Sequence, residues 1–123
     1  MRRILRIVII VMGMGFTLQG LGFLVVPSRA ASALGMPLLD GLGRSTQVGD
    51  FAAFFLMLGL SILVGMRPGR TRLLYFPAAL MGSAALCRTL AWAVHGAAFA
   101  TTFILVEIVG CILLLTAAGR VES

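Results

Sequence analysis

Apolar residues fill four long stretches of the chain, and short segments rich in polar residues, glycine or proline separate them. A helix needs about 20 predominantly apolar residues to cross the hydrocarbon core of a bilayer. Each stretch reaches about that length, so the pattern predicts membrane-spanning helices over residues 4–26, 46–66, 73–95 and 97–118. The predicted fold class is therefore all-α: an integral membrane four-helix bundle that occupies residues 1–123 as a single domain.

The connection between the first two spans, residues 27–45, is too short and too interrupted to cross a membrane. It begins at Pro27, which ends the first helix because proline cannot continue the hydrogen-bond ladder. Glycine and proline recur along it, so we expect an interfacial or re-entrant segment with a short amphipathic helix. Gly96 and little else separates the last two spans, which are therefore predicted to form an antiparallel hairpin.

The first span shares some features with a secretory signal. Arg2 and Arg3 precede it, and Ala31 and Ala33 have the spacing of a cleavage site. The apolar region of a signal is about 7–15 residues long, whereas this span is longer and ends well before that site. A retained first helix is favoured, with cleavage as the alternative.

The composition agrees with a membrane location. Hydrophobic residues make up 60% of the chain and charged residues 11%, and the mean hydropathy is +1.09. Soluble domains are about 45–50% apolar and about 25% charged. Too few polar residues remain to cover a surface that faces water, which excludes a soluble globular protein.

Arginines are distributed unequally between the two ends of the predicted helices. The net charge of +6 comes from ten arginines and no lysine. With four spans, the N-terminus, the turn at 67–72 and the C-terminus share one side and carry seven arginines, whereas the other side carries Arg29 and Arg44. Positive residues stay on the cytoplasmic side. We therefore expect a multi-pass protein of the bacterial inner membrane with both termini in the cytoplasm, and no nucleic-acid partner.

Arg88 lies deep inside a predicted span, with no other charged residue between Arg72 and Glu107. At about 1.5 Å of rise per residue, Arg88 lies roughly 12 Å below the turn at Gly96, and Glu107 roughly 15 Å below it on the next helix. Charged side chains within a membrane cost about 2.5–3.5 kcal/mol each on insertion scales, and they are retained when they pair or serve a function. The matching depths predict an ion pair between Arg88 and Glu107.

The other strongly polar side chains of the spans fall in the same outer half of the bundle. Trp92 and His95 follow Arg88 at i+4 and i+7, on one face of the helix. We therefore expect an outward-facing polar pocket that binds a small molecule. Its predicted residues are Gln19, Arg44, Asp50, Arg88, Trp92, His95 and Glu107.

Each of these residues also has a purely structural interpretation. The ion pair would then only fix the register between the third and fourth helices. Trp92 would be an interfacial anchor, and His95 a solvated residue at a helix end. Asp50 would favour a helix start, and Gln19 would bridge helices.

Motifs for metals, cofactors or catalysis are not evident. The single histidine excludes haem or a di-metal centre held by paired histidines, and Cys87 and Cys111 lack the spacing of a zinc site. We expect no metal, no cofactor and no catalytic residues.

Short motifs along nearly the whole chain resemble a bacterial family of four-helix membrane proteins catalogued only as a domain of unknown function, broadly similar in layout to DoxX-like proteins. They are "GDFAAFF" after Arg44, "RP" at 67–68, "CRTLAWAVHG" around Arg88 and "LVEIVG" around Glu107. The resemblance implies a fold and no activity.

Three functions are compatible with this sequence. The first is a non-enzymatic bundle that binds a lipid-like or quinone-like molecule in its outer pocket, or that serves as an accessory subunit of a membrane complex. The alternative is a small dimeric proton-coupled transporter with Glu107 or Asp50 as proton carrier. An arginine beside Glu107 would stabilise its charged form and disfavours this role. A membrane enzyme acting on a lipid is the third.

Overall fold

The computed structural model describes residues 2–120, and every regular element in this range is helical. The elements in chain order are α1 (Arg3–Val25), α2 (Pro27–Ala33), α3 (Gly41–Gly65), the 3₁₀ helix η1 (Thr71–Leu74), α4 (Tyr75–His95) and α5 (Thr101–Ala118). The helices α1, α3 and α5, and α4 together with η1, are long and apolar enough to cross a membrane. The predicted all-α fold with four apolar helices is confirmed.

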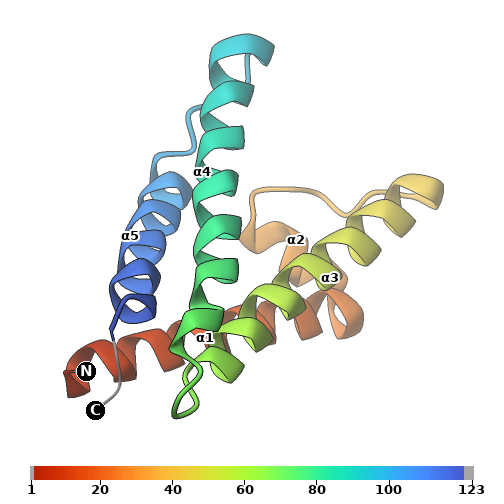
Figure 1. Cartoon of the computed structure of the whole chain (residues 1–123). Helices are drawn as coiled ribbons and strands as arrows, with labels where there is room; N and C mark the ends of the chain where they lie inside the picture. The colour runs from red at the N-terminus through yellow and green to blue at the C-terminus, as the bar shows by residue number, and fades with distance from the viewer. Residues whose placement is uncertain (1, 121–123) are drawn as a thin grey trace.

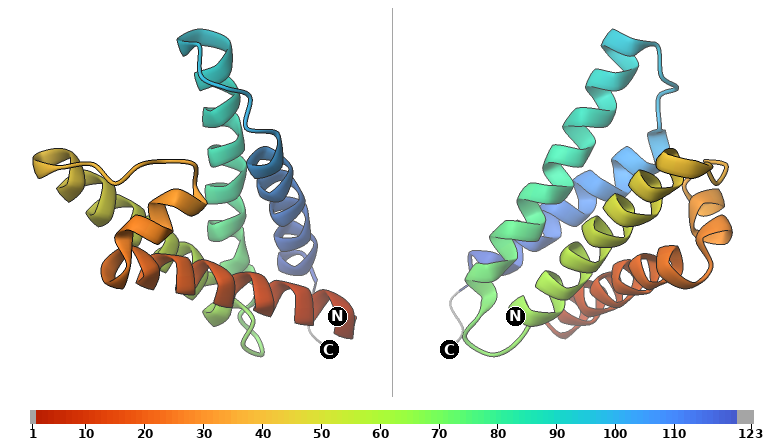
Figure 2. Two further views of the ribbon diagram at one scale, coloured as in Figure 1. Left: turned by 180° about the vertical axis from the view of Figure 1, so that it is seen from behind. Right: turned by 90° about the vertical axis from the view of Figure 1, so that its right-hand side faces the viewer.

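The helices pack as two pairs, α1 with α3 and α4 with α5 (Figure 1). The pairs meet near the two chain termini and the turn between α3 and α4, and they separate toward the opposite end (Figures 1 and 2). We call the first the closed end and the second the open end. A hydrogen bond of 3.2 Å from Thr71 Oγ1 to the carbonyl of Arg120 fixes the turn to the end of α5 at the closed end.

Glycines let the backbones of α1 and α3 approach each other closely. A Cβ atom on Gly20 would lie 2.8 Å from the backbone nitrogen of Leu56, and one on Gly59 would lie 2.7 Å from the carbonyl oxygen of Gly13. No larger side chain fits at such distances, which is the usual role of small residues between membrane helices. Gly13 and Gly20 both make such close contacts, whereas Gly15 has no heavy atom within 4 Å of its Cβ position.

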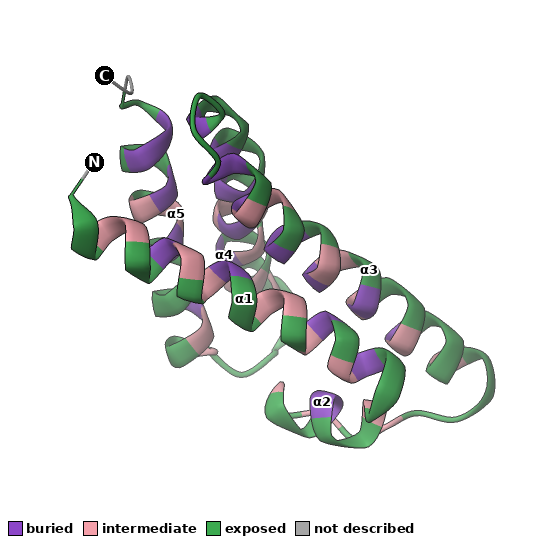
Figure 3. Cartoon of the chain, turned by 90° about the horizontal axis from the view of Figure 1, so that it is seen from below, coloured by how far each residue is buried: buried purple, intermediate pink, exposed green. Residues whose placement is uncertain are grey.

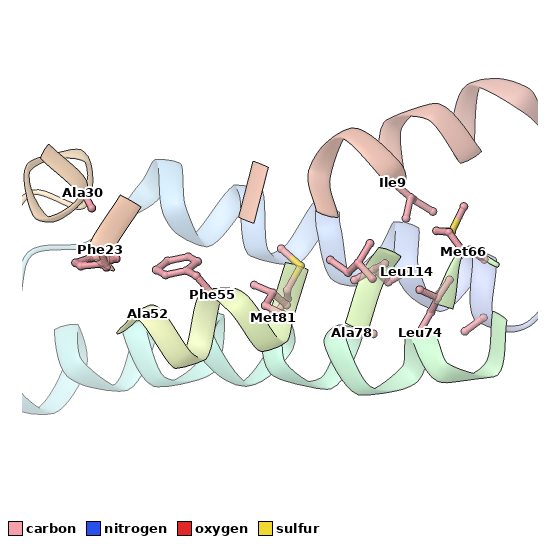
Figure 4. Packing of buried hydrophobic residues seen from close by; sticks show 14 of the residues in the cluster. Ile9, Phe23, Ala30, Ala52, Phe55, Met66, Leu74, Ala78, Met81 and Leu114 are labelled. Atoms are coloured by element: carbon pink, nitrogen blue, oxygen red, sulfur yellow. The ribbon is translucent and has the colours of Figure 1, made fainter. Parts of the chain in front are cut away.

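The core follows the junction of the two pairs (Figure 4). At the closed end it contains Ile9, Leu74 and Leu114, all fully buried. Towards the open end it continues into stacked phenylalanine rings, with Phe23 centred 5.5 Å from Phe51. Buried positions face the inside of the assembly and exposed positions face outwards (Figure 3), and many of the exposed side chains are large and apolar, as contact with lipid requires.

Two helix boundaries differ from the prediction. The helix α3 begins at Gly41, not at residue 46, so only α2 and residues 34–40 form the connection after α1. The amide of Arg44 donates to the carbonyl of Asp40 and closes the first turn of α3. Because this turn contains Gly41 and Gly43, the sequence had suggested a loop there. The helix α5 begins at Thr101, not at residue 97, because a left-handed Gly96 ends α4 and residues 97–100 form a loop.

Candidate functional site

A cavity of about 430 Å³ lies between the two helix pairs, and we call it the central cavity. Its polar lining residues are Gln19, Arg88, Thr102 and Glu107, and its other walls are mostly apolar or aromatic. A second cavity of about 550 Å³, the side cavity, shares Arg88 and Glu107 with it and adds Asp50. Both depend on the divergence of the pairs, since a tightly closed bundle would fill this volume with side chains.

Arg88 from α4 and Glu107 from α5 are in direct contact, with Nε 2.9 Å from Oε1. The guanidinium carbon of Arg88 lies 4.7 Å from the centre of the Phe103 ring, within range of a cation–π interaction. The contact is electrostatic and not a well-directed hydrogen bond, because Oε1 is buried and receives no hydrogen bond within residues 2–120. The Arg88 side chain is 36% exposed and that of Glu107 only 13%. The carboxylate is therefore the more buried member of the pair.

Gln19 lines the central cavity and also joins two helices. Its Nε2 donates a hydrogen bond of 3.1 Å to the carbonyl of Ala30, which ties α1 to α2. The structure therefore shows the bridging contact that one interpretation of Gln19 predicted, with the side chain at the cavity wall as well.

Asp50 and Arg44 are placed apart. Asp50 is exposed and lines the side cavity. Arg44 lines neither cavity; it pairs with Asp40 at 3.0 Å and donates from Nε to the carbonyl of Leu39 at 2.7 Å. The reason is the early start of α3, which places Arg44 in the first turn and its side chain against the preceding loop.

Trp92 and His95 also lie outside both cavities. Each is exposed, and the indole of Trp92 packs edge-to-face on Phe99, 5.1 Å away between ring centres. The last turns of α4 project beyond the start of α5 (Figure 1), so these residues lack a neighbouring helix that would enclose them. The prediction started the last helix at residue 97 and not at Thr101, and it therefore wrongly included Trp92 and His95 in the pocket.

Several lining residues were not predicted from the sequence. They include Thr102 and Phe103 at the start of α5, and Gly15 and Phe16 on α1. A signal existed on α1, because Met12, Phe16 and Gln19 share one helix face by their spacing. Phe54 and Phe55 on α3 are two further lining residues, and Phe55 also stacks on Phe23 in the core.

The chemistry offered by this arrangement is that of binding. One guanidinium, one carboxylate and a few hydrogen-bonding groups lie among apolar walls. In residues 2–120, no cluster of three or more histidine, cysteine, aspartate or glutamate side chains forms that could hold a metal ion.

No curated protein and no solved structure matches the chain. A family described as "Domain of unknown function (DUF4345)" matches residues 4–118. The DoxX-like layout and a bacterial source stay predictions. The match spans all four apolar helices and both members of the Arg88–Glu107 pair, and the chain belongs to the DUF4345 family.

Proposed function

We propose that this protein is a non-enzymatic membrane protein whose central cavity binds a lipid-like or quinone-like molecule. The observation that carries the proposal is a cavity of about 430 Å³ with mostly apolar walls and a small set of polar groups. Small-molecule sites have this character: they are concave, largely apolar, and use few polar groups to fix orientation.

The cavity walls suggest how such a molecule is held. Arg88 and Glu107 come from α4 and α5, whereas Phe16 and Leu58 come from α1 and α3. A polar end would contact Arg88, and an apolar part would lie against the aliphatic and aromatic side chains. Both helix pairs would then contribute to one site.

Apolar packing at the closed end favours binding over transport. Ile9, Leu74 and Leu114 are fully buried at the closed end, and Figure 4 shows Ile9 and Leu114 packed near Leu74. A proton carried by Glu107 or Asp50 would have to cross this layer. The alternative of a proton-coupled transporter is therefore less well supported.

The proposed location is the bacterial inner membrane, with both termini in the cytoplasm. Seven of the ten arginines belong to the termini and to the turn at 67–72, and these segments gather at the closed end. In this orientation the open end faces away from the cytoplasm. Single cysteines at Arg70 and Ser45, in a variant without Cys87 and Cys111, test it: an impermeant thiol reagent added outside should label only position 45. Labelling only at position 70 would invert the orientation.

Native mass spectrometry of the protein extracted gently from its own membrane tests the binding function. Gly15 lines the central cavity, and no heavy atom lies within 4 Å of its Cβ position. Gly15→Leu therefore fills the cavity without displacing the backbone. Gly49→Leu is the matched control, because Gly49 is equally unobstructed in α3 and lines neither cavity.

The expected result is a bound small molecule in the wild type and in Gly49→Leu, and its loss in Gly15→Leu. A molecule retained by Gly15→Leu would place the binding elsewhere on the protein. A wild type that carries a second polypeptide and no small molecule would instead support an accessory role in a membrane complex, and a second copy of this chain would support a homodimer.

A further inference from the structure

Three ionisable side chains line the two cavities: Arg88, Glu107 and Asp50. Arg88 is the only positive one, and the two carboxylates outnumber it. The neighbouring pair of Arg44 and Asp40 lies outside both cavities and compensates itself. The positive charge of Arg88 is therefore already compensated by carboxylates of the protein when no ligand is bound.

Arg88 presents hydrogen-bond donors to the central cavity. Arg88 is the more exposed member of the ion pair, and Oε1 of Glu107 is buried beside it. The nitrogen of Arg88 in contact with Glu107 is Nε, so its two terminal nitrogens are the further donors. A guanidinium has only donors. A ligand atom that meets these nitrogens must therefore be an acceptor.

We infer that the polar end of the ligand is an uncharged hydrogen-bond acceptor, such as an ester or quinone carbonyl, and that the site discriminates against amphiphilic acids. This inference rests on the proposed binding function and names its ligand class. An acid in the central cavity would bring a second negative charge beside Glu107, with Asp50 in the adjoining side cavity and Arg88 as the one cation that lines either cavity. Repulsion between like charges is strong where the dielectric constant is low. A cationic head group would instead face the guanidinium.

Three amphiphiles with the same undecyl tail separate these possibilities: methyl dodecanoate, dodecanoate and undecylammonium. They differ only in head group, so their tails make the same apolar contacts. Their binding to purified protein in a maltoside detergent is measured by native mass spectrometry. The wild type is expected to bind the ester at least about tenfold more tightly than the acid or the amine, which corresponds to about 1.4 kcal/mol.

Glu107→Gln removes the carboxylate beside Arg88, leaves the central cavity with one uncompensated cation, and provides the decisive comparison. With Arg88 no longer compensated by its partner, the acid should gain at least about tenfold in affinity relative to the ester. Asp40→Asn is the matched control: it removes a carboxylate of an exposed ion pair outside both cavities, and the ratio should not change. Should Glu107→Gln fail to fold, Asp50→Asn removes a charge from the side cavity and should shift the ratio in the same direction by a smaller factor.

The outcomes distinguish a failure of the inference about the head group from a failure of the proposed binding function. Suppose that Gly15→Leu abolishes binding of the preferred probe, so that binding does occur in the central cavity. The inference alone would then be overturned if the wild type prefers the acid or the amine. It would also be overturned if the variants at Glu107 and Asp50 leave the affinity ratio of acid to ester unchanged. If none of the three probes binds, or if all bind Gly15→Leu as well as the wild type, then the proposed cavity function fails together with it.

Discussion

The interface between α1 and α3 and the interface between α4 and α5 use different chemistry to bring two helices together. Between α1 and α3, glycines permit backbone contact, with Gly59 packed against Gly13 and Thr17. Between α4 and α5, side chains make the contacts: Met81 fills the space beside Gly110, and Arg88 meets Glu107. The first interface leaves almost no freedom for adjustment, whereas the second contains flexible methionine and a charged pair.

This difference explains where the candidate site lies. Backbone contact positions α1 and α3 rigidly, so their inner face is a fixed wall. The charged pair is held on α4 and α5, and it faces that wall across the central cavity. The charged groups of the site lie on one helix pair and most of its apolar surface lies on the other, so changes at either interface should affect the site.

The largest effect is expected at the glycine interface. Gly59→Leu inserts a side chain where even a Cβ would overlap the backbone of α1, so the two helices must separate. Overpacking of a dense core costs about 1–3 kcal/mol or more, and backbone overlap puts this variant at or above the upper end. Unfolding in mixed micelles should show the loss, with Gly49→Leu near the wild type. Equal stability of the two variants would contradict the close packing of α1 and α3.

An intermediate effect is expected at the ion pair. Arg88→Leu leaves a buried carboxylate without its partner, and breaking a buried pair costs about 3–5 kcal/mol, whereas replacing both members by apolar residues is often close to neutral. The partial exposure of Arg88 places the single variant at the lower end of that range. The double variant Arg88→Leu/Glu107→Leu should recover most of the loss in the same unfolding assay. Additive losses would mean that the two side chains do not interact.

The smallest effect is expected at the hydrogen bond between α1 and α2. Gln19→Leu removes the donor to the Ala30 carbonyl but keeps the side-chain volume. Hydrogen bonds between membrane helices average about 0.6 kcal/mol, so global stability should change little. Amide hydrogen exchange should nevertheless increase in residues 27–33 and not in α4, because only α2 loses a connection. Unchanged exchange in α2 would show that apolar contacts alone hold it.

The sequence alone predicted the fold class and part of the site. The lengths of the apolar stretches predicted four spans, because the bilayer thickness sets the minimum length of a helix that crosses it. Matching depth on neighbouring helices predicted the Arg88–Glu107 contact, which the structure contains at 2.9 Å. These inferences depend on local composition and on a rise per residue that is the same in every helix.

Three of the predicted pocket residues were placed elsewhere by the tertiary structure. Arg44, Trp92 and His95 lie outside the cavities because α3 starts at Gly41 and α5 only at Thr101. Both boundaries depend on the conformation of the preceding loop, and a loop that contains glycine can adopt several backbone conformations of similar free energy. The sequence offered no means of choosing among them.

What the sequence determined by itself is the four apolar helices of this protein and the pairing of Arg88 with Glu107. The helices follow from the transfer free energy of each segment, and the pairing follows from equal depth on neighbouring helices. What only the tertiary structure decided is that the two helix pairs diverge, leaving a cavity where Phe16, Phe54 and Phe103 meet the charged pair. Divergence is a property of how whole helices pack, and such packing depends on residues far apart in the chain, as the contact of Gly59 with Gly13 and Thr17 illustrates within one pair.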